Sequence, residues 1–330
     1  MNKMRAKRKT NKPIVFITRQ IPDAAIRLLK EKNYILKVYP EDLPIPKNIL
    51  LKNIVNADAV ISLLTEKFDP PVIDTMKRCK IIANYAVGYN NIDVKYAFEK
   101  NIIVTNTPDV LTDSTADLAI ALLLACARRI VEAESFARAG LYKAWKPNLL
   151  LGVELKNKYF GILGAGRIGT AAAIRAKAFG TKILYFSDVK NEFLENNLEA
   201  KRLSLNSILK KSDFVSIHLP LTAKTFHLLG KENLALLKQS AILINTSRGE
   251  IIDEEELIKV LKRKRIYAAG LDVFENEPEI NMELFKLDNV VLLPHIGSAT
   301  IEARTGMALL AAKNVVAVLS GKKALTPVKF

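Results

Sequence analysis

The chain has 330 residues, of which 49% are hydrophobic and 25% are charged, a composition typical of a globular protein with room for two domains. Its longest apolar run, residues 118–127, is too short to span a bilayer, and no signal peptide pattern precedes the first strand, so we expect a cytoplasmic protein without a membrane segment. Two cysteines and three histidines at no ligand spacing argue against a zinc site.

The formal net charge of +16 is unevenly distributed along the chain. Six basic residues and no acid fall within residues 1–12, which we expect to form a disordered basic tail. Elsewhere basic and acidic residues alternate along predicted helices, as on a solvated surface, and no nucleic-acid recognition motif accompanies them. We therefore expect no nucleic-acid partner; the positive field would instead attract an anionic substrate and cofactor.

The first part of the chain predicts short strands separated by helices, the pattern of an α/β protein with a parallel sheet. The predicted strands are residues 14–17, 35–38, 59–63, 81–85 and 102–104. The first helix is predicted over residues 22–31, with a proline at its start.

A long helix is then predicted over residues 111–139, because the capping residues 112–114 precede a long apolar stretch. An irregular segment, residues 140–158, separates this helix from a second series of strands. The second series is predicted at residues 159–163, 182–186, 213–217, 241–245, 267–273 and 289–293. One apolar helix, residues 299–319, closes the chain.

The turn after the first strand of the second series reads Gly164-Ala165-Gly166-Arg167-Ile168-Gly169, the spacing of a dinucleotide-binding loop. In such loops the first glycine permits a tight turn, the second lets the backbone approach a pyrophosphate, and the third allows close helix packing. The context fits, because an alanine-rich helix and a second strand follow, and Asp188 lies 19 residues beyond Gly169. The sequence therefore predicts a dinucleotide site in the second series and leaves the first series for the substrate.

Three late strands of the second series are followed by side chains suited to the oxidoreduction of a 2-oxo acid. Arg248 follows one strand, Glu275 and Glu277 follow the next, and His295 follows the last. Because the carboxyl ends of parallel strands meet at one edge of a sheet, we expect these side chains to lie together. An arginine binds a carboxylate, a histidine exchanges a proton with the C2 oxygen, and a carboxylate orients the histidine. From position alone, either Glu275 or Glu277 could orient the histidine.

Eight segments in order resemble the D-isomer-specific 2-hydroxyacid dehydrogenase family, over nearly the whole chain from residue 14 onward. They are residues 87–93, 106–108, 111–117, 164–169, 218–222, 245–249, 270–278 and 294–300. The resemblance implies an α/β fold of two doubly wound parallel-sheet domains. A Rossmann dinucleotide-binding domain, residues 107–298, would be inserted in a flavodoxin-like substrate domain made of residues 13–106 and 299–330.

The resemblance also assigns roles to single residues. Arg248 would bind the substrate carboxylate and carbonyl, His295 would be the acid/base, and Glu277, the acid directly before proline, would support His295. Two backbone N–H groups would hold the carboxylate, and the implied substrate-binding residues are Val87 and Gly88 with Leu64 beside them, and Trp145. The implied cofactor-binding residues are Thr115, Gly164, Gly166, Arg167, Ile168, Gly169, Ser187, Asp188, Leu219, Pro220, Thr246, Asp272 and Gly297.

Within the family, residues 145–147 and 294–300 are similar to glyoxylate/hydroxypyruvate reductases, which implies reduction of small 2-oxo acids to 2-hydroxy acids, of D configuration where chiral. The long helix would pack across a two-fold homodimer. Trp145, the only tryptophan, would either reach the partner's substrate pocket or anchor the dimer. A D-3-phosphoglycerate or D-lactate dehydrogenase, and a nucleotide-sensing corepressor-like protein on the same fold, are the alternatives.

The end of the second Rossmann strand bears on the choice of cofactor. Many NAD-using relatives place an acid where this chain has Ser187, and Asp188 comes one residue later. NADP-preferring reductases of this branch tend to have an arginine at that later position. A carboxylate repels a 2′-phosphate and accepts a hydrogen bond from a 2′-hydroxyl, so we expect NAD, with NADP as the alternative.

Overall fold

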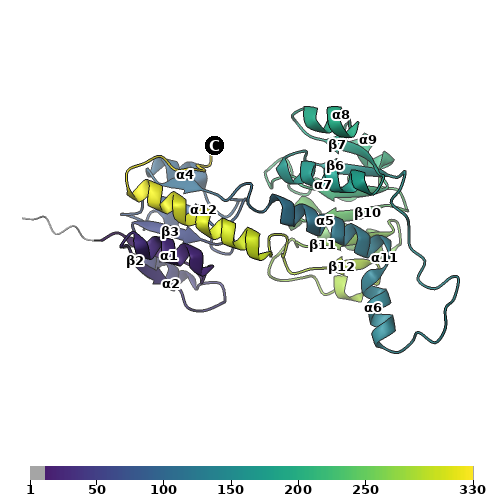
Figure 1. Ribbon diagram of the computed structural model, residues 1–330, viewed down its shortest axis with the longest axis horizontal. Coiled ribbons are helices and arrows are strands. Elements are labelled where there is room, and N and C mark those ends of the chain that lie inside the picture. Colours follow the sequence, from purple (N-terminus) through teal and green to yellow (C-terminus); the bar gives the residue numbers. More distant parts are fainter. Residues whose placement is uncertain (1–11, 330) are drawn as a thin grey trace, which may run out of the picture. The chain divides into compact units, whose positions relative to one another are not determined.

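The computed structural model describes residues 12–329 and divides into two compact units (Figure 1). The first unit extends to Leu111 and resumes at Thr300, and the second runs from Thr112 to Ala299. The sequence predicts that the chain enters the second unit at residue 107 and leaves it before residue 299. The expected basic tail lies outside the described residues except for Lys12, whose Nζ donates to Asn33 Oδ1 at 2.7 Å.

The first unit is a five-stranded parallel sheet in the order β2-β1-β3-β4-β5. Its strands are β1 (Ile14–Ile17), β2 (Ile35–Val38), β3 (Ala59–Ser62), β4 (Ile81–Asn84) and β5 (Ile103–Thr105). Its helices are α1 (Asp23–Glu31), α2 (Lys47–Ile54), α3 (Pro70–Ile73), α4 (Val94–Glu99) and α12 (Ile301–Leu319). All residues of β3 and β4 are buried, as expected for strands covered on both faces. The last helix, α12, packs against α1, β3 and β4, so the C-terminal part of the chain completes this unit.

The second unit is a seven-stranded parallel sheet in the order β12-β11-β10-β9-β6-β7-β8. Its strands are β6 (Tyr159–Leu163), β7 (Lys182–Phe186), β8 (Lys201–Arg202), β9 (Phe214–Ile217), β10 (Ile242–Asn245), β11 (Ala268–Leu271) and β12 (Val290–Leu292). Its helices are α5 (Thr112–Ala127), α6 (Ile130–Arg138), α7 (Arg167–Ala178), α8 (Glu192–Leu198), α9 (Leu205–Lys211), α10 (Lys231–Leu234) and α11 (Glu254–Lys262). The strand order reverses at β6, whose neighbours are β7 and β9, and ligands of open α/β sheets bind beside such a reversal. The predicted fold class, two parallel-sheet α/β domains, is confirmed.

The single helix predicted over residues 111–139 was wrong, because α5 ends at Ala127 and α6 is a separate helix. Arg129, between them, has a left-handed backbone with φ of 52°. The returning chain explains the break: Val153 N–H donates to Ala127 O at 2.8 Å, which occupies a carbonyl that the next helical turn would need. Figure 1 shows the segment after α6 as a wide loop that returns to β6.

Within residues 12–329, no helix combines the length and the apolar character needed to cross a bilayer.

Candidate active site

The loop between β6 and α7 has the geometry of a phosphate-binding turn. Gly164 has φ of +100°, and a Cβ there would lie 2.6 Å from the carbonyl oxygen of His218. A Cβ at Gly169 would lie 2.1 Å from Gly164 O, so the close approach of α7 to the turn requires this glycine. Gly166 differs, because a Cβ there would meet nothing within 4 Å. The space beside Gly166 is therefore open.

The N-terminus of α7 opens beside that space. Gly166 is its N-cap and provides no side-chain cap, and the first turn, which begins with Arg167 and Ile168, contains no acid. Backbone N–H groups at a helix N-terminus and the helix dipole favour an anion. The residues of this turn therefore fit a dinucleotide pyrophosphate.

Other predicted cofactor residues lie at the carboxyl ends of neighbouring strands. Thr246 follows β10, and its Oγ1 is buried without a hydrogen-bond partner among the described residues, as expected of a group that meets a ligand. Asp272 follows β11 and accepts the N–H groups of Ile296 and Gly297, both at 2.7 Å. Burial raises the pKa of Asp272, and these two bonds and the charge of His295 oppose that effect. Thr115 Oγ1 donates to Gly297 O at 3.1 Å.

The residues predicted for the adenosine side lie in the turns after β7 and β9. Ser187 and Asp188 follow β7, and Arg202 of β8 donates to both of their carbonyl oxygens, at 2.8 Å and 2.7 Å respectively. Asp188 is exposed. After β9, Leu219 O accepts the Ser247 hydroxyl and Pro220 O accepts the Thr225 hydroxyl.

The predicted acid/base pair is formed. His295 Nδ1 and Glu277 Oε2 are 2.7 Å apart, and Glu277 Oε1 accepts Phe274 N–H at 3.1 Å. Because the carboxylate accepts, Nδ1 carries a proton and Nε2 is the nitrogen left to face a substrate. Among residues 12–329, Nε2 makes no hydrogen bond. The side chains of His295 and Glu277 are 29% and 33% exposed, so the pair is accessible.

Arg248 belongs to the same edge of the sheet. It follows β10, is half-buried, and Nη1 donates to Ser247 O at 2.7 Å. Burial lowers the pKa of Arg248, while the charges of Glu277 and Glu250 raise it. The second unit therefore brings Arg248, Glu277 and His295 together, as the strand ends predicted.

The first unit presents three of the predicted substrate residues near the carboxyl ends of its own strands. Leu64 follows β3, and Val87 and Gly88 follow β4. Asn106 Nδ2 donates to Val87 O and Asn84 Nδ2 donates to Gly88 O, both at 2.8 Å. Neither Val87 N–H nor Gly88 N–H makes a hydrogen bond within the described chain, so both are available to an anion.

Sequence reasoning missed Asn84 and Asn106, which hold this loop. Asn84 is the last residue of β4 and is fully buried, at 0% exposure. A polar side chain at the end of a buried apolar strand was the available signal, because buried amides must be hydrogen-bonded.

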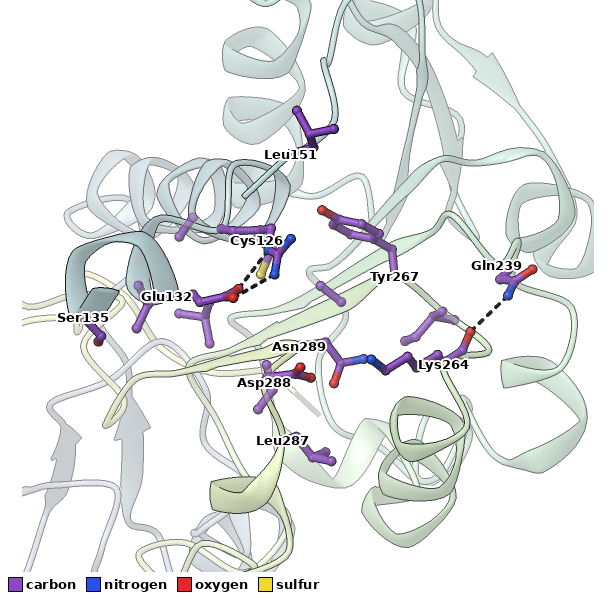
Figure 2. A pocket seen from close by; sticks show the side chains of 17 residues that line it. Cys126, Glu132, Ser135, Leu151, Gln239, Lys264, Tyr267, Leu287, Asp288 and Asn289 are labelled. Carbon is purple, nitrogen blue, oxygen red and sulfur yellow. Dashed lines mark hydrogen bonds and ion pairs between the residues drawn. The ribbon is translucent and has the colours of Figure 1, made fainter. Parts of the chain in front are cut away.

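Two features of the second unit lie apart from these residues. Trp145 is 78% exposed in the segment after α6. A cavity of about 590 Å³ lies near the amino ends of β11 and β12, lined by residues such as Cys126, Glu132, Tyr267 and Asp288 (Figure 2). Burial raises the pKa of the Cys126 thiol to about 12, so it is not a nucleophile at neutral pH. None of the predicted site residues lines this cavity.

Comparison with known proteins bears on the identity of this site. Residues 120–297 match the model of the D-isomer specific 2-hydroxyacid dehydrogenase family, NAD binding domain. A glyoxylate reductase of Thermococcus litoralis is 52% identical over 315 residues, which cover 94% of this chain and 95% of the relative. A glyoxylate reductase of Pyrococcus horikoshii is 50% identical, with 94% of each chain covered.

Solved structures agree with these relatives. A Thermus thermophilus protein superposes with a TM-score of 0.90 at 43% identity, over 96% of this chain and 100% of that one. An NADPH-dependent glyoxylate/hydroxypyruvate reductase of Sinorhizobium meliloti, in complex with NADP and malonate, gives a TM-score of 0.84 at 32% identity, over 96% and 97%. From the matched family model, the full-length relatives and the paired acid and histidine, the chain belongs to the D-isomer specific 2-hydroxyacid dehydrogenases.

Proposed function

We propose that the chain reduces small 2-oxo acids, glyoxylate and hydroxypyruvate first, to 2-hydroxy acids that have the D configuration where they are chiral. The observation that carries the proposal is the 2.7 Å contact of His295 Nδ1 with Glu277, at the edge where Arg248 also lies. Relatives of about 50% identity over 94% of the chain are glyoxylate reductases, which supports this substrate class.

Each residue of the proposed site has a distinct role in the reaction. A nicotinamide cofactor held by the second unit would supply the hydride for C2 of the substrate. His295 would give its Nε2 proton to the C2 oxygen, which balances the hydride and completes the hydroxyl. Glu277 holds the ring through Nδ1 and stabilises the imidazolium before transfer. The Arg248 guanidinium binds the substrate carboxylate and polarises the carbonyl.

In the first unit, we assign substrate binding to the loop after β4. The N–H groups of Val87 and Gly88 offer two donors to a carboxylate, and the side-chain amides of Asn84 and Asn106 fix the loop through its carbonyls. Leu64 supplies an apolar contact beside them. Small acids need few such contacts, so orientation depends on a few directed hydrogen bonds.

The cofactor is a nicotinamide dinucleotide, and we propose that it is NAD. Asp188 is exposed at the end of β7, where its carboxylate would repel a 2′-phosphate. Thr115 would contact the cofactor phosphates, and Asp272 would bond the nicotinamide carboxamide, with Thr246 and Gly297 as further cofactor contacts.

We also propose a homodimer. The segment from α6 onward exposes large apolar side chains, and α6 buries none of its residues within its own chain. The exposed residues are Ile130, Val131, Leu141, Tyr142, Trp145 and Leu151. Such a contiguous apolar segment is typical of a subunit interface.

An initial-rate panel tests the proposed reaction. Wild type and His295→Ala are assayed with glyoxylate, hydroxypyruvate, pyruvate and 3-phosphohydroxypyruvate, each with NADH and NADPH. We expect the first two acids to give the highest kcat/KM, and His295→Ala to lose about 10²–10⁴-fold in rate with unchanged NADH affinity. Preference for pyruvate or for the phosphorylated acid would identify a D-lactate or D-3-phosphoglycerate dehydrogenase. Tight NADH binding without any turnover would identify a nucleotide sensor.

A further inference from the structure

Arg248 and Glu277 lie in two different loops of the second unit, and His227 is hydrogen-bonded to both loops. Arg248 lies in the loop after β10, and Glu277 lies in the loop after β11. The His227 backbone N–H donates to Glu250 O at 2.8 Å, and its ring Nε2 lies 2.7 Å from Glu275 Oε1. His227 thus contacts one loop two residues from Arg248 and the other loop two residues from Glu277.

The loop after β11 is also bonded to Glu254, the first residue of α11, which follows the loop after β10. Glu275 Oε2 accepts the N–H of Glu254, and Glu254 Oε2 accepts the N–H of Glu275, both at 3.2 Å. A Cβ at Gly249 would lie 1.9 Å from the carbonyl carbon of Phe274, so the backbones of the two loops are in direct contact. Because this contact leaves no free space, a displacement of Glu275 also displaces the backbone beside Arg248 and the backbone beside Glu277.

His227 is itself held in one position. Its backbone is left-handed, with φ of 47°, and the ring of Phe226 stacks on the imidazole at a centroid distance of 4.0 Å. The side chains of His227 and Glu275 are 34% and 22% exposed. Burial raises the pKa of Glu254, and the charge of Glu275 adds to this effect, so a donor facing Glu275 relieves the crowding of two carboxylates.

We propose that His227 is a positioning residue for the reaction. By donating its backbone N–H to Glu250 and its ring N–H to Glu275, it fixes the Arg248 loop relative to the Glu277–His295 pair. The inference rests on the function proposed for that pair, because His227 acts through the two loops and not on the substrate.

Two substitutions of His227 and a matched control separate this role from general stability. His227→Phe keeps a ring for Phe226 and removes the donor, whereas His227→Gln restores an Nε2 donor. The control is Lys238→Gln, which breaks the Lys238–Asp213 pair. That pair has a 2.8 Å contact and exposed fractions of 34% and 18%, close to those of His227 and Glu275. Asp213 precedes β9 and Lys238 precedes β10, so the pair lies at the amino edge of the sheet.

Each variant is compared with wild type in kcat and KM for glyoxylate, in NADH affinity, and in amide hydrogen exchange of residues 248–254 and 273–278 without cofactor. We expect His227→Phe to lower kcat/KM about 10-fold, because small displacements of positioned groups are costly, and to leave NADH affinity unchanged. Exchange should become faster in both segments. His227→Gln should recover most of the rate and the protection, and Lys238→Gln should change neither.

Faster exchange with wild-type kinetics would overturn the positioning role. An equal loss of rate in His227→Phe and His227→Gln, or a parallel loss of NADH affinity, would also overturn it. A wild-type protein inactive on every 2-oxo acid would refute the proposed function instead, and the exchange data would still decide whether His227 holds the two loops.

Discussion

His295 is held by its backbone as much as by Glu277. Its φ is 54°, and its N–H donates to Asp272 O at 2.9 Å. A left-handed conformation in a residue other than glycine costs on the order of 1–2 kcal/mol, so it persists only where the surroundings impose it. Here the carbonyl of Asp272 and the carboxylate of Glu277 fix the backbone and the ring together, which preorganises Nε2 before a substrate arrives.

Asp188→Arg should raise the ratio of kcat/KM for NADPH to that for NADH. The substitution replaces repulsion of a 2′-phosphate with a charged hydrogen bond, and Arg202, already bound to the carbonyls of Ser187 and Asp188, leaves the side chain at this position free to turn outward. Initial rates with both cofactors at a fixed glyoxylate concentration measure the ratio. An unchanged ratio would show that Asp188 does not face the ribose.

His218 should make stability fall with acid. Burial lowers its pKa to about 4, and Ser216 Oγ lies 2.9 Å from Nε2. The unfolded chain binds a proton below about pH 6.5 while the folded protein does not, so the free energy of unfolding drops as the pH falls from 6.5 toward 4. Between pH 7.5 and pH 5 this residue should remove about 2 kcal/mol. Urea unfolding of wild type and His218→Gln measures it, and an equal acid loss in both would exclude His218 as the source.

At the scale of elements, the turn from β6 to α7 contains Gly166, which we propose contacts the cofactor, and Gly169, which the packing of α7 requires. Gly166→Ala adds a Cβ that meets no atom within 4 Å, so stability should change by less than about 1 kcal/mol, because the weaker N-cap and the stiffer unfolded chain offset each other. NADH affinity should fall at least about 10-fold, because the methyl would occupy the space proposed for the pyrophosphate. Gly169→Ala places a Cβ 2.1 Å from Gly164 O and should cost about 1–3 kcal/mol of stability.

Thermal unfolding of the cofactor-free variants and NADH titration by fluorescence distinguish the two effects. If Gly166→Ala bound NADH as wild type does, the dinucleotide would not approach the backbone there.

Some strands and helix ends could be predicted from the sequence, and others could not. The buried strands were predictable, because apolar runs such as 241–244 are bounded by turn residues, and the glycine turn was recognisable from its flanking strands. The end of α5 was not, because it depends on Val153, which is distant in sequence from Ala127. The strand β8, two exposed residues that pair with β7, has no apolar pattern to reveal it.

Some residues of the candidate site could likewise be predicted from the sequence, and others could not. Strand ends indicated Arg248, Glu277 and His295, because parallel strands end at one edge. His227 and its bond to Glu275 gave no signal, because the residues are 48 apart and follow different strands.

At the scale of the whole molecule, the exposed indole of Trp145 connects the proposed dimer to the substrate. If it caps the partner's pocket, Trp145→Ala should raise KM for hydroxypyruvate about 5–30-fold more than for glyoxylate, because only the larger acid has a hydroxymethyl group to contact. The dimer should survive, since α5 and α6 would supply most of the interface. Kinetics and light scattering measure the two effects. Equal changes in KM, or dissociation to monomers, would make Trp145 an interface anchor.

The bond from Thr115 to Gly297 joins the points where the chain enters and leaves the second unit. While the second unit is folded, its first and last residues are held together. It therefore connects the two parts of the first unit as a short loop would, despite its length. A flexible loop of about 190 residues would cost about 2.5 kcal/mol more in closure entropy than one of about 10, since the cost grows with the logarithm of length. When the second unit unfolds, the five-stranded sheet must bear the closure entropy of this long flexible loop. The folding of the first unit is therefore cooperative with the folding of the second.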